Sequence, residues 1–208
     1  MKRFLWIIIV IILINALFVS TSFTTQNIPE DLEKRLQGIR TLKGLFIQET
    51  YIKALGRKQV FEGEFFMKKP DKFMWLYKKG STDRIYINGE RIIIYQPSEH
   101  QAFVTQKKRI GISGSPLRML MDIEELQRDF KITTHNNRLI LTPANSSAMV
   151  KNIELQLAKD SGLIQKIILH DIYDNKTTIE ISHVTINEPI EDDVFKFKPP
   201  EGTTIINQ

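Results

Sequence analysis

The segment EGEFFMKKPDKFMWLYKK, residues 62–79, decides which fold this sequence is expected to adopt. Side chains alternate between the two faces of a β-strand, so Phe65 and Met67 share a face and the neighbouring acids lie on the other. Pro70 cannot donate a ladder hydrogen bond and therefore separates this strand from the next. In the second strand one face carries Phe73, Trp75 and Tyr77, and the other carries Met74 and Leu76. The segment predicts two antiparallel strands, the second of them apolar on both sides.

Further short segments rich in aromatic and β-branched residues flank this pair and predict additional strands. Gly, Pro, Asn and Asp separate them, as expected for turns. The Asn88-Gly89 step predicts a type I′ hairpin, which needs a positive φ at both central residues. The expected strands are residues 45–52, 59–69, 71–79, 83–87, 91–96, 101–106, 130–134, 138–143, 151–158, 163–171 and 177–187.

Helical spacing of apolar residues appears in only two places. Residues 28–42 place Leu32, Leu36 and Ile39 on one side of a short helix, which Gly38 helps to end. Residues 115–130 repeat the pattern after Ser115. The expected fold class is therefore mainly β with short helices (α+β).

The N-terminus has the pattern of an export signal. Lys2 and Arg3 precede an apolar run over residues 4–19, and small residues follow up to Ser22. This order is typical of a secretory signal peptide, so we expect residues 1–22 to be removed and residues 23–208 to form one domain. An uncleaved membrane anchor is the alternative, because the run is close to the lower length limit for a spanning helix.

Composition excludes several classes of protein. The chain contains no Cys, which rules out disulfides, thiol catalysis and a lipidated N-terminal Cys. Removing Lys2 and Arg3 lowers the formal charge from +5 to +3, too little to indicate a nucleic-acid partner. We expect the mature chain to be free in the periplasm or at the cell surface, monomeric and without a cofactor.

Catalytic patterns are also missing. The histidines His100, His135, His170 and His183 have none of the spacings typical of metal ligands. The sequence GISGS, residues 111–115, lacks the last Gly of a nucleophile elbow. Glu62 and Glu64 share a strand face, but alternating acids are the ordinary solvent face of a sheet. We expect no catalytic residues, no metal site and no enzymatic activity.

Strands that are apolar on both sides have two explanations. Both faces of the sheet are covered, as in the core of a sandwich, or one face lines an internal cavity. A large antiparallel sheet with short amphipathic helices and many Phe, Trp, Tyr and Met side chains suits a cavity for an apolar ligand.

The chain resembles the periplasmic lipoprotein carrier family, the LolA family. The resemblance lies in LKGLFIQ (residues 42–48), EGEFFMKKPDKFMW (62–75), NGERIIIYQP (88–97), SPLRML (115–120) and FKFKPPEGT (195–203), in family order. It implies a half-open antiparallel β-barrel of about eleven strands, lidded by short α-helices over a hydrophobic cavity.

Family roles transfer to individual positions of this sequence. The family's Arg-Pro step corresponds to Lys69-Pro70, where lysine replaces an arginine that contacts the helical lid. Phe73 corresponds to a residue at the cavity mouth that acts in transfer. The expected lining of the acyl cavity is Phe46, Phe65, Met67, Trp75 and Tyr95, and the expected lid residues are Lys69, Leu117 and Leu120.

The resemblance implies a carrier that ferries lipoproteins from the inner to the outer membrane by sheltering their acyl chains. The implied partners are acylated lipoproteins, an inner-membrane lipoprotein-releasing ABC transporter and an outer-membrane lipoprotein acceptor. A periplasmic sensor or regulator of the same fold, binding a lipid or peptide, is the alternative.

Overall fold

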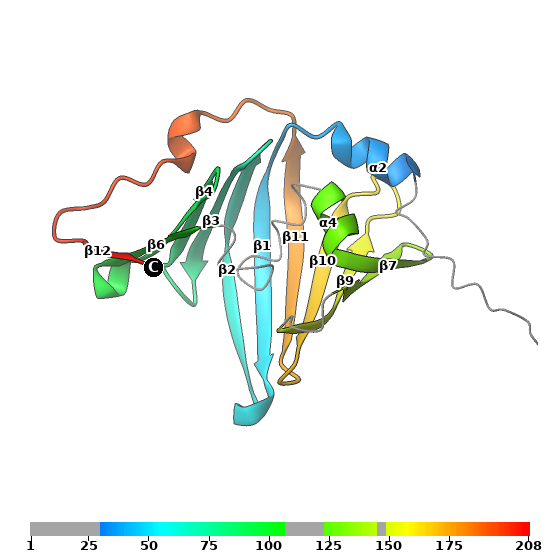
Figure 1. The fold of residues 1–208 in the computed structure, drawn as a ribbon, viewed down its shortest axis with the longest axis horizontal. Helices are drawn as coiled ribbons and strands as arrows, with labels where there is room; N and C mark the ends of the chain where they lie inside the picture. The colour runs from blue at the N-terminus through cyan, green and yellow to red at the C-terminus, as the bar shows by residue number, and fades with distance from the viewer. Residues whose placement is uncertain (1–29, 107–122, 145–148) are drawn as a thin grey trace, which may run out of the picture.

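A computed structural model describes residues 30–106, 123–144 and 149–208, and shows one broad, strongly curved β-sheet (Figure 1). The predicted signal peptide and the expected lid residues Leu117 and Leu120 lie outside the described residues. The sheet has twelve strands in the order β12-β6-β5-β4-β3-β2-β1-β11-β10-β9-β8-β7. Its two edge strands, β12 and β7, do not pair with one another, so the barrel is half open.

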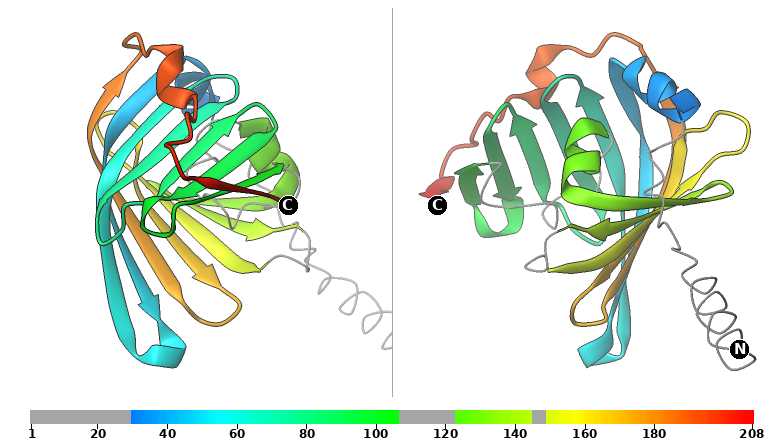
Figure 2. Two further views of the ribbon diagram at one scale, coloured as in Figure 1. Left: turned by 90° about the vertical axis from the view of Figure 1, so that its left-hand side faces the viewer. Right: turned by 45° about the vertical axis from the view of Figure 1, so that its right-hand side comes forward.

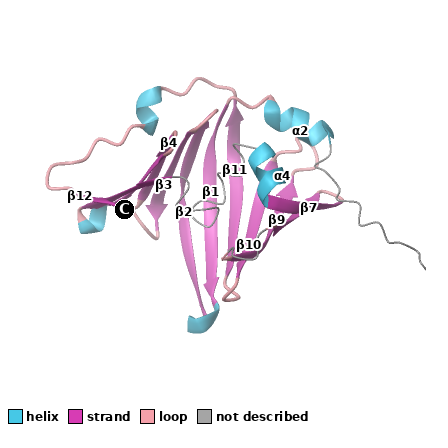
Figure 3. Ribbon diagram, viewed as in Figure 1, coloured by secondary structure: helices cyan, strands magenta, loops and turns pink. Residues whose placement is uncertain are grey.

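Eleven of the strands were predicted from the sequence, and neighbours among them pair antiparallel. Most of the described residues are accordingly drawn as strand in Figure 3. The strands are β1 (Thr41–Ile52), β2 (Arg57–Lys68), β3 (Lys72–Lys79), β4 (Arg84–Asn88), β5 (Arg91–Gln96), β6 (Gln101–Gln106), β7 (Phe130–His135), β8 (Arg138–Pro143), β9 (Val150–Leu157), β10 (Ile164–Asp171), β11 (Lys176–Ile186) and β12 (Thr204–Asn207).

The twelfth strand, β12, was not predicted. It pairs parallel with β6, with Thr204 opposite Gln101. Four residues are too few to show a period-two pattern, and the pairing depends on backbone groups that lie far apart in the sequence.

The predicted type I′ turn was wrong. Asn88 is the last residue of β4 and pairs with Arg91, so the loop is Gly89-Glu90, and of these two only Gly89 has a positive φ, of 61°. Gly at the first central position is typical of a type II′ turn.

The two α-helices in the described part of the chain are short and lie on the concave side of the sheet, as the two views of Figure 2 show. They are α2 (Glu30–Gln37) and α4 (Ile123–Asp129), and the single-turn 3-10 helices are η1 (Lys53–Leu55), η2 (Pro97–Glu99) and η5 (Asp192–Phe195). The amide of Gly38 donates to the carbonyl of Lys34 and ends α2 where the sequence predicted.

Buried side chains form a separate cluster on each face of the sheet. The inner cluster lies between the concave face and the helices, and includes Leu36, Phe46, Phe65, Phe73, Trp75, Leu126, Leu141, Ile153 and Ile167. The outer cluster lies on the opposite face of β3–β6, and consists of Met74, Tyr86, Ile93, Tyr95, Ala102, Ile190 and Phe195. Strands β3 to β5 are apolar on both sides because both of their faces are covered.

The C-terminal arm, residues 187–208, covers the outer face. It leaves the end of β11, crosses toward the β4–β6 side of the sheet and ends in β12 (Figure 1). Phe195 is buried against the sheet at 1% exposure. Lys68 and Lys72 hold the arm through Asp192, each with an Nζ to carboxylate distance of 2.7 Å. Hydrogen bonds from these two lysines lower the pKa of Asp192 from 3.8 to about 2.

We predict that this attachment weakens in acid. A carboxyl group whose pKa is lower in the folded state stabilises that state above its unfolded pKa, and the contribution disappears as the group becomes protonated. Asp192→Asn should therefore lower the thermal unfolding midpoint at neutral pH. The difference from the wild type should close as the pH falls from 3.8 to about 2. The exposed Asp160, replaced by Asn, is the control. A difference between wild type and Asp192→Asn that does not depend on pH would contradict the prediction.

Candidate binding site

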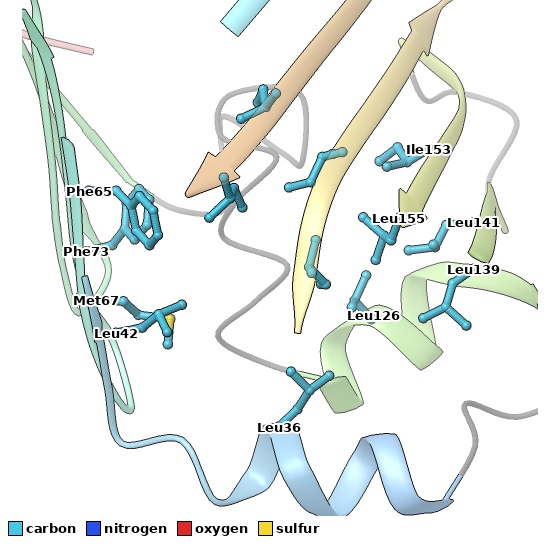
Figure 4. Packing of buried hydrophobic residues seen from close by; sticks show 14 of the residues in the cluster. Leu36, Leu42, Phe65, Met67, Phe73, Leu126, Leu139, Leu141, Ile153 and Leu155 are labelled. Atoms are coloured by element: carbon cyan, nitrogen blue, oxygen red, sulfur yellow. The ribbon is translucent and has the colours of Figure 1, made fainter. Parts of the chain in front are cut away.

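Strand pairing collects the predicted aromatic residues on the inner face of β1–β3. Phe65 pairs with Trp75, and Met67 with Phe73, across β2 and β3. The Phe46 ring stacks on Trp75 with 3.6 Å between centroids and 19° between planes. All five side chains are buried, with exposures between 0% and 4%. Phe46, Phe65, Met67, Phe73 and Trp75 thus form one continuous apolar wall, and Figure 4 shows three of them side by side.

Glycines opposite two of these aromatic rings make the wall possible. Gly63 lies across the strand pair from Phe46, and Gly44 lies across from Phe65. A Cβ atom on Gly63 would lie 2.0 Å from the carbonyl oxygen of Leu76 and 2.6 Å from the Phe46 ring. A Cβ on Gly44 would lie 2.9 Å from the Phe65 ring. Each ring therefore occupies space that only glycine leaves open.

A second apolar wall faces the first across the interior of the half-barrel. It comes from β8 and β9, where Leu139, Leu141, Ile153 and Leu155 are buried. Leu36 of α2 and Leu126 of α4 close the interior at the end shown at the bottom of Figure 4. The interior of the half-barrel is therefore lined by hydrocarbon from both sides.

The gap beneath α2 is narrow. Its free volume is about 20 Å³, close to the space that one water molecule requires. Every lining residue is apolar: Leu36, Ile39, Leu42, Met67, Leu163, Ile164, Ile181 and Val184. The open hydrophobic cavity that we expected is thus closed at this place, because side chains of α2 pack directly on the sheet.

Lys69 fastens α2 to the end of β2. Its Nζ donates to the carbonyl oxygen of Leu36 at 2.7 Å, and its backbone amide donates to the carbonyl of Arg40 at 2.8 Å. A cation next to the last carbonyls of a helix also interacts favourably with the helix dipole. The family resemblance implied a contact with the helical lid at this position, and here the lysine ammonium contacts the last turn of α2.

Asn187 is a second fastening residue, and sequence reasoning missed it. Its Oδ1 accepts from the amide of Arg40 at 2.7 Å, and its Nδ2 donates to the carbonyl of Gly38 at 3.1 Å. The side chain thereby joins the chain following α2 to the end of β11. Its backbone has a positive φ of 59°. The only signal in the sequence is an Asn directly after a strand, a residue type that tolerates this conformation.

The apolar interior ends in polar groups toward the β1–β2 hairpin. The hydroxyl of Tyr77 donates to Oε1 of Gln48 at 3.0 Å, and the hydroxyls of Thr50 and Thr177 lie 3.2 Å apart. Burial raises the pKa of Tyr77, so its hydroxyl stays protonated and available as a donor. An amphiphile in the interior would meet hydrocarbon near α2 and hydrogen-bonding groups at this end.

Tyr95 does not belong to the inner wall, contrary to expectation. It packs on the outer face against Phe197 of the C-terminal arm, with 5.1 Å between ring centroids. Side chains alternate along β5, so that Ile92 and Ile94 face inward while Ile93 and Tyr95 face outward. Both faces of β5 are apolar, so the pattern alone could not show which side is the interior.

The described residues hold little that resembles a catalytic centre. They contain no group of three His, Cys, Asp or Glu side chains placed to hold a metal ion. Glu62 and Glu64 point to the outer face, where Lys79 and Lys78 neutralise them. None of the described helices is long and apolar enough to span a bilayer.

The fold and its interior define a class of protein: a half-open β-barrel whose helices cover a concave apolar face. Residues 37–198 match the family described as "Outer membrane lipoprotein carrier protein LolA", and the chain belongs to that family.

The sequence of this chain aligns with individual relatives over most of their length. An outer-membrane lipoprotein carrier protein of Halorhodospira halophila is 25% identical over 198 residues, which is 93% of this chain and 92% of the relative. One from Methylobacillus flagellatus is 27% identical over 187 residues, 84% of this chain and 91% of the relative. The fold is also similar to an uncharacterised conserved protein of Thermus thermophilus, with a TM-score of 0.53, 9% identity, and coverage of 86% of this chain and 98% of that one.

We predict that Gly63→Ala destabilises the protein by about 1–3 kcal/mol, the usual cost of overpacking a core. The new methyl group would clash with both the Phe46 ring and the backbone carbonyl of Leu76, so both must shift. Chemical denaturation measures the change. Gly38→Ala is the control, because its Cβ would approach no atom closer than 3.4 Å. Equal unfolding free energies for wild type and Gly63→Ala would contradict this account of the wall.

We predict that Lys69→Met loosens α2. Loss of a charge-assisted hydrogen bond to Leu36 should increase amide hydrogen exchange in residues 30–37 about tenfold. Lys69→Arg should keep exchange slow, because a guanidinium offers more donors to the same carbonyl. Lys34→Met removes an exposed lysine of the same helix and serves as the control. Unchanged exchange in Lys69→Met would show that this contact does not hold the helix.

Proposed function

We propose that this protein is a periplasmic carrier that shelters the acyl chains of lipoproteins between its concave sheet and α2. The observation that carries the proposal is the continuous hydrocarbon lining of the interior, in a chain of the lipoprotein carrier family. Residues 1–22 would be removed on export. The protein would receive lipoproteins from an inner-membrane lipoprotein-releasing ABC transporter and deliver them to an outer-membrane lipoprotein acceptor.

The energetics of hydrocarbon in water explain why such cargo needs a carrier. Each exposed methylene costs about 0.8 kcal/mol, so a chain of about sixteen carbons costs about 12 kcal/mol. Hydrophobic burial is enough to hold this cargo, so the carrier would need no covalent step, cofactor or catalytic residue.

Loading would require movement of α2. The gap beneath the helix has about 20 Å³ of free volume, far too little for an acyl chain. Apolar contacts of Leu36 and Ile39 hold the helix in place, together with hydrogen bonds from Lys69 to Leu36 and from Arg35 to the carbonyl of Ser161. These contacts would break when the helix lifts, and the acyl chain would replace its apolar side chains on the sheet. Because α2 competes with the cargo for the same surface, the carrier would bind the cargo moderately and release it.

A synthetic acylated peptide tests this proposal, with Trp75 as the reporter. Trp6 is the only other tryptophan and lies in the predicted signal peptide, so in the exported protein fluorescence would report on Trp75 alone. We expect the acylated peptide to change its emission and the same peptide without acyl chains to leave it unchanged.

Variants locate the binding surface. Val184 lines the gap beneath α2, and Val184→Glu should weaken binding at least about tenfold, because the acyl chain would have to desolvate a carboxylate. Ile47 is 48% exposed on the outer face of β1, and Ile47→Glu should bind like the wild type. Equal binding of acylated and unacylated peptides, or wild-type binding by Val184→Glu, would contradict the proposal.

A further inference from the structure

Two hairpins protrude together from the end of the sheet farthest from α2, as Figures 1 and 2 show. One joins β1 to β2 through η1, and the other joins β10 to β11. We name this region the hairpin tip and define it as residues 51–58, 149–151 and 170–176. Its position at the end of the longest strands leaves it accessible from several sides.

The hairpin tip carries exposed apolar side chains on adjoining turns. Leu55 is 58% exposed, Tyr173 64%, Ile172 45% and Met149 46%. The amide of Ile172 donates to the carbonyl of Met149 at 3.1 Å, which places these two residues side by side. Single exposed apolar residues are common, but a group of them on one protruding end indicates an interaction surface.

Bonds between the two hairpins fix this arrangement. Asp174 pairs with both Lys53 of η1 and Lys151 of β9. The amide of Lys53 donates to Oδ1 of Asn175 at 3.0 Å. The hairpin tip is therefore a preorganised surface built from three segments of the chain, and a partner would lose little entropy in ordering it.

The hairpin tip is also basic. It contains five basic residues, Lys53, Arg57, Lys58, Lys151 and Lys176, and two acidic residues, Asp171 and Asp174. Both acids are already engaged, since Asp174 bridges two lysines and Asp171 accepts from the backbone amides of its own turn. Lys58 pairs with Glu49. Arg57 and Lys176 are exposed, and no side-chain partner is found for either among the described residues.

We propose that the hairpin tip docks on the surface of a bilayer that contains anionic phospholipid. Leu55, in the turn between Lys53 and Arg57, would enter the headgroup region together with Tyr173, whose amphipathic ring suits that depth. Arg57 and Lys176 would meet the lipid phosphates, with their aliphatic stems lying along the apolar surface. Strands β1 and β2 carry both this tip and the inner aromatic wall, so docking would orient the interior relative to the membrane.

Vesicle flotation with the protein recovered from the periplasm tests this proposal. Wild-type protein should float with vesicles of phosphatidylglycerol and phosphatidylcholine, and much less with phosphatidylcholine alone. The double variants Leu55→Ser/Tyr173→Ser and Arg57→Gln/Lys176→Gln should each need about tenfold more anionic lipid for half-maximal flotation. All four positions are exposed, so both variants should retain the wild-type unfolding midpoint.

Matched controls carry similar substitutions elsewhere. Leu45→Ser/Ile47→Ser alters apolar residues that are 40% and 48% exposed on the outer face. Lys34→Gln/Lys198→Gln alters exposed cations far from the hairpin tip. Both controls should float like the wild type, and both tip variants should still bind the acylated peptide, which separates docking from cargo binding. The proposal is overturned if wild-type protein does not float with anionic vesicles, or if the controls lose as much flotation as the tip variants. It is also overturned if an acidic protein binds the hairpin tip while vesicles do not.

Discussion

A wide, curved sheet with hydrocarbon on its concave face must keep that face away from water, and the rest of the structure follows from this constraint. In the described residues α2 and α4 provide cover, with Leu36 and Leu126 turned into the interior. The same face stabilises the fold and is the surface on which we propose that an acyl chain binds. In the proposed carrier, the cargo would replace the helix as the hydrophobic cover of this face, and the net free-energy cost of loading would be the difference between the two.

The outer face meets the same constraint in a different way. Here the C-terminal arm lies over β3–β6, held by buried Phe195 and by the Lys68–Asp192–Lys72 bridge. The sheet thus has one face with a fixed cover and one face covered by a short helix that a few hydrogen bonds fasten. This asymmetry is why we propose that the inner face is the one that opens, although both faces are apolar in β3–β5.

Much of this architecture could be predicted from the sequence, because strand alternation and helical spacing are local properties. Eleven strands, α2 and the shared face of Phe65 and Met67 followed from such patterns, whereas the grouping of Phe46 and Trp75 with them was implied by the family resemblance. The side of the sheet on which Tyr95 lies could not be predicted, since both faces of β5 are apolar and only the path of the C-terminal arm distinguishes them. Three other features could not be predicted because they join residues far apart in the chain, and local sequence patterns do not encode such contacts. They are the pairing of β12, the two hydrogen bonds of the Asn187 side chain and the tight packing beneath α2.

The central claim is that the acyl chain occupies the inner face of the sheet, and paramagnetic broadening by a spin label on that chain tests it most directly. With the labelled peptide bound, the account predicts that methyl signals of Ile164, Ile181 and Val184, which line the gap beneath α2, are broadened. Signals of Ile47 and Ile93, on the outer face, should remain sharp. Broadening of the outer-face methyl groups with sharp signals from the inner three would contradict the account.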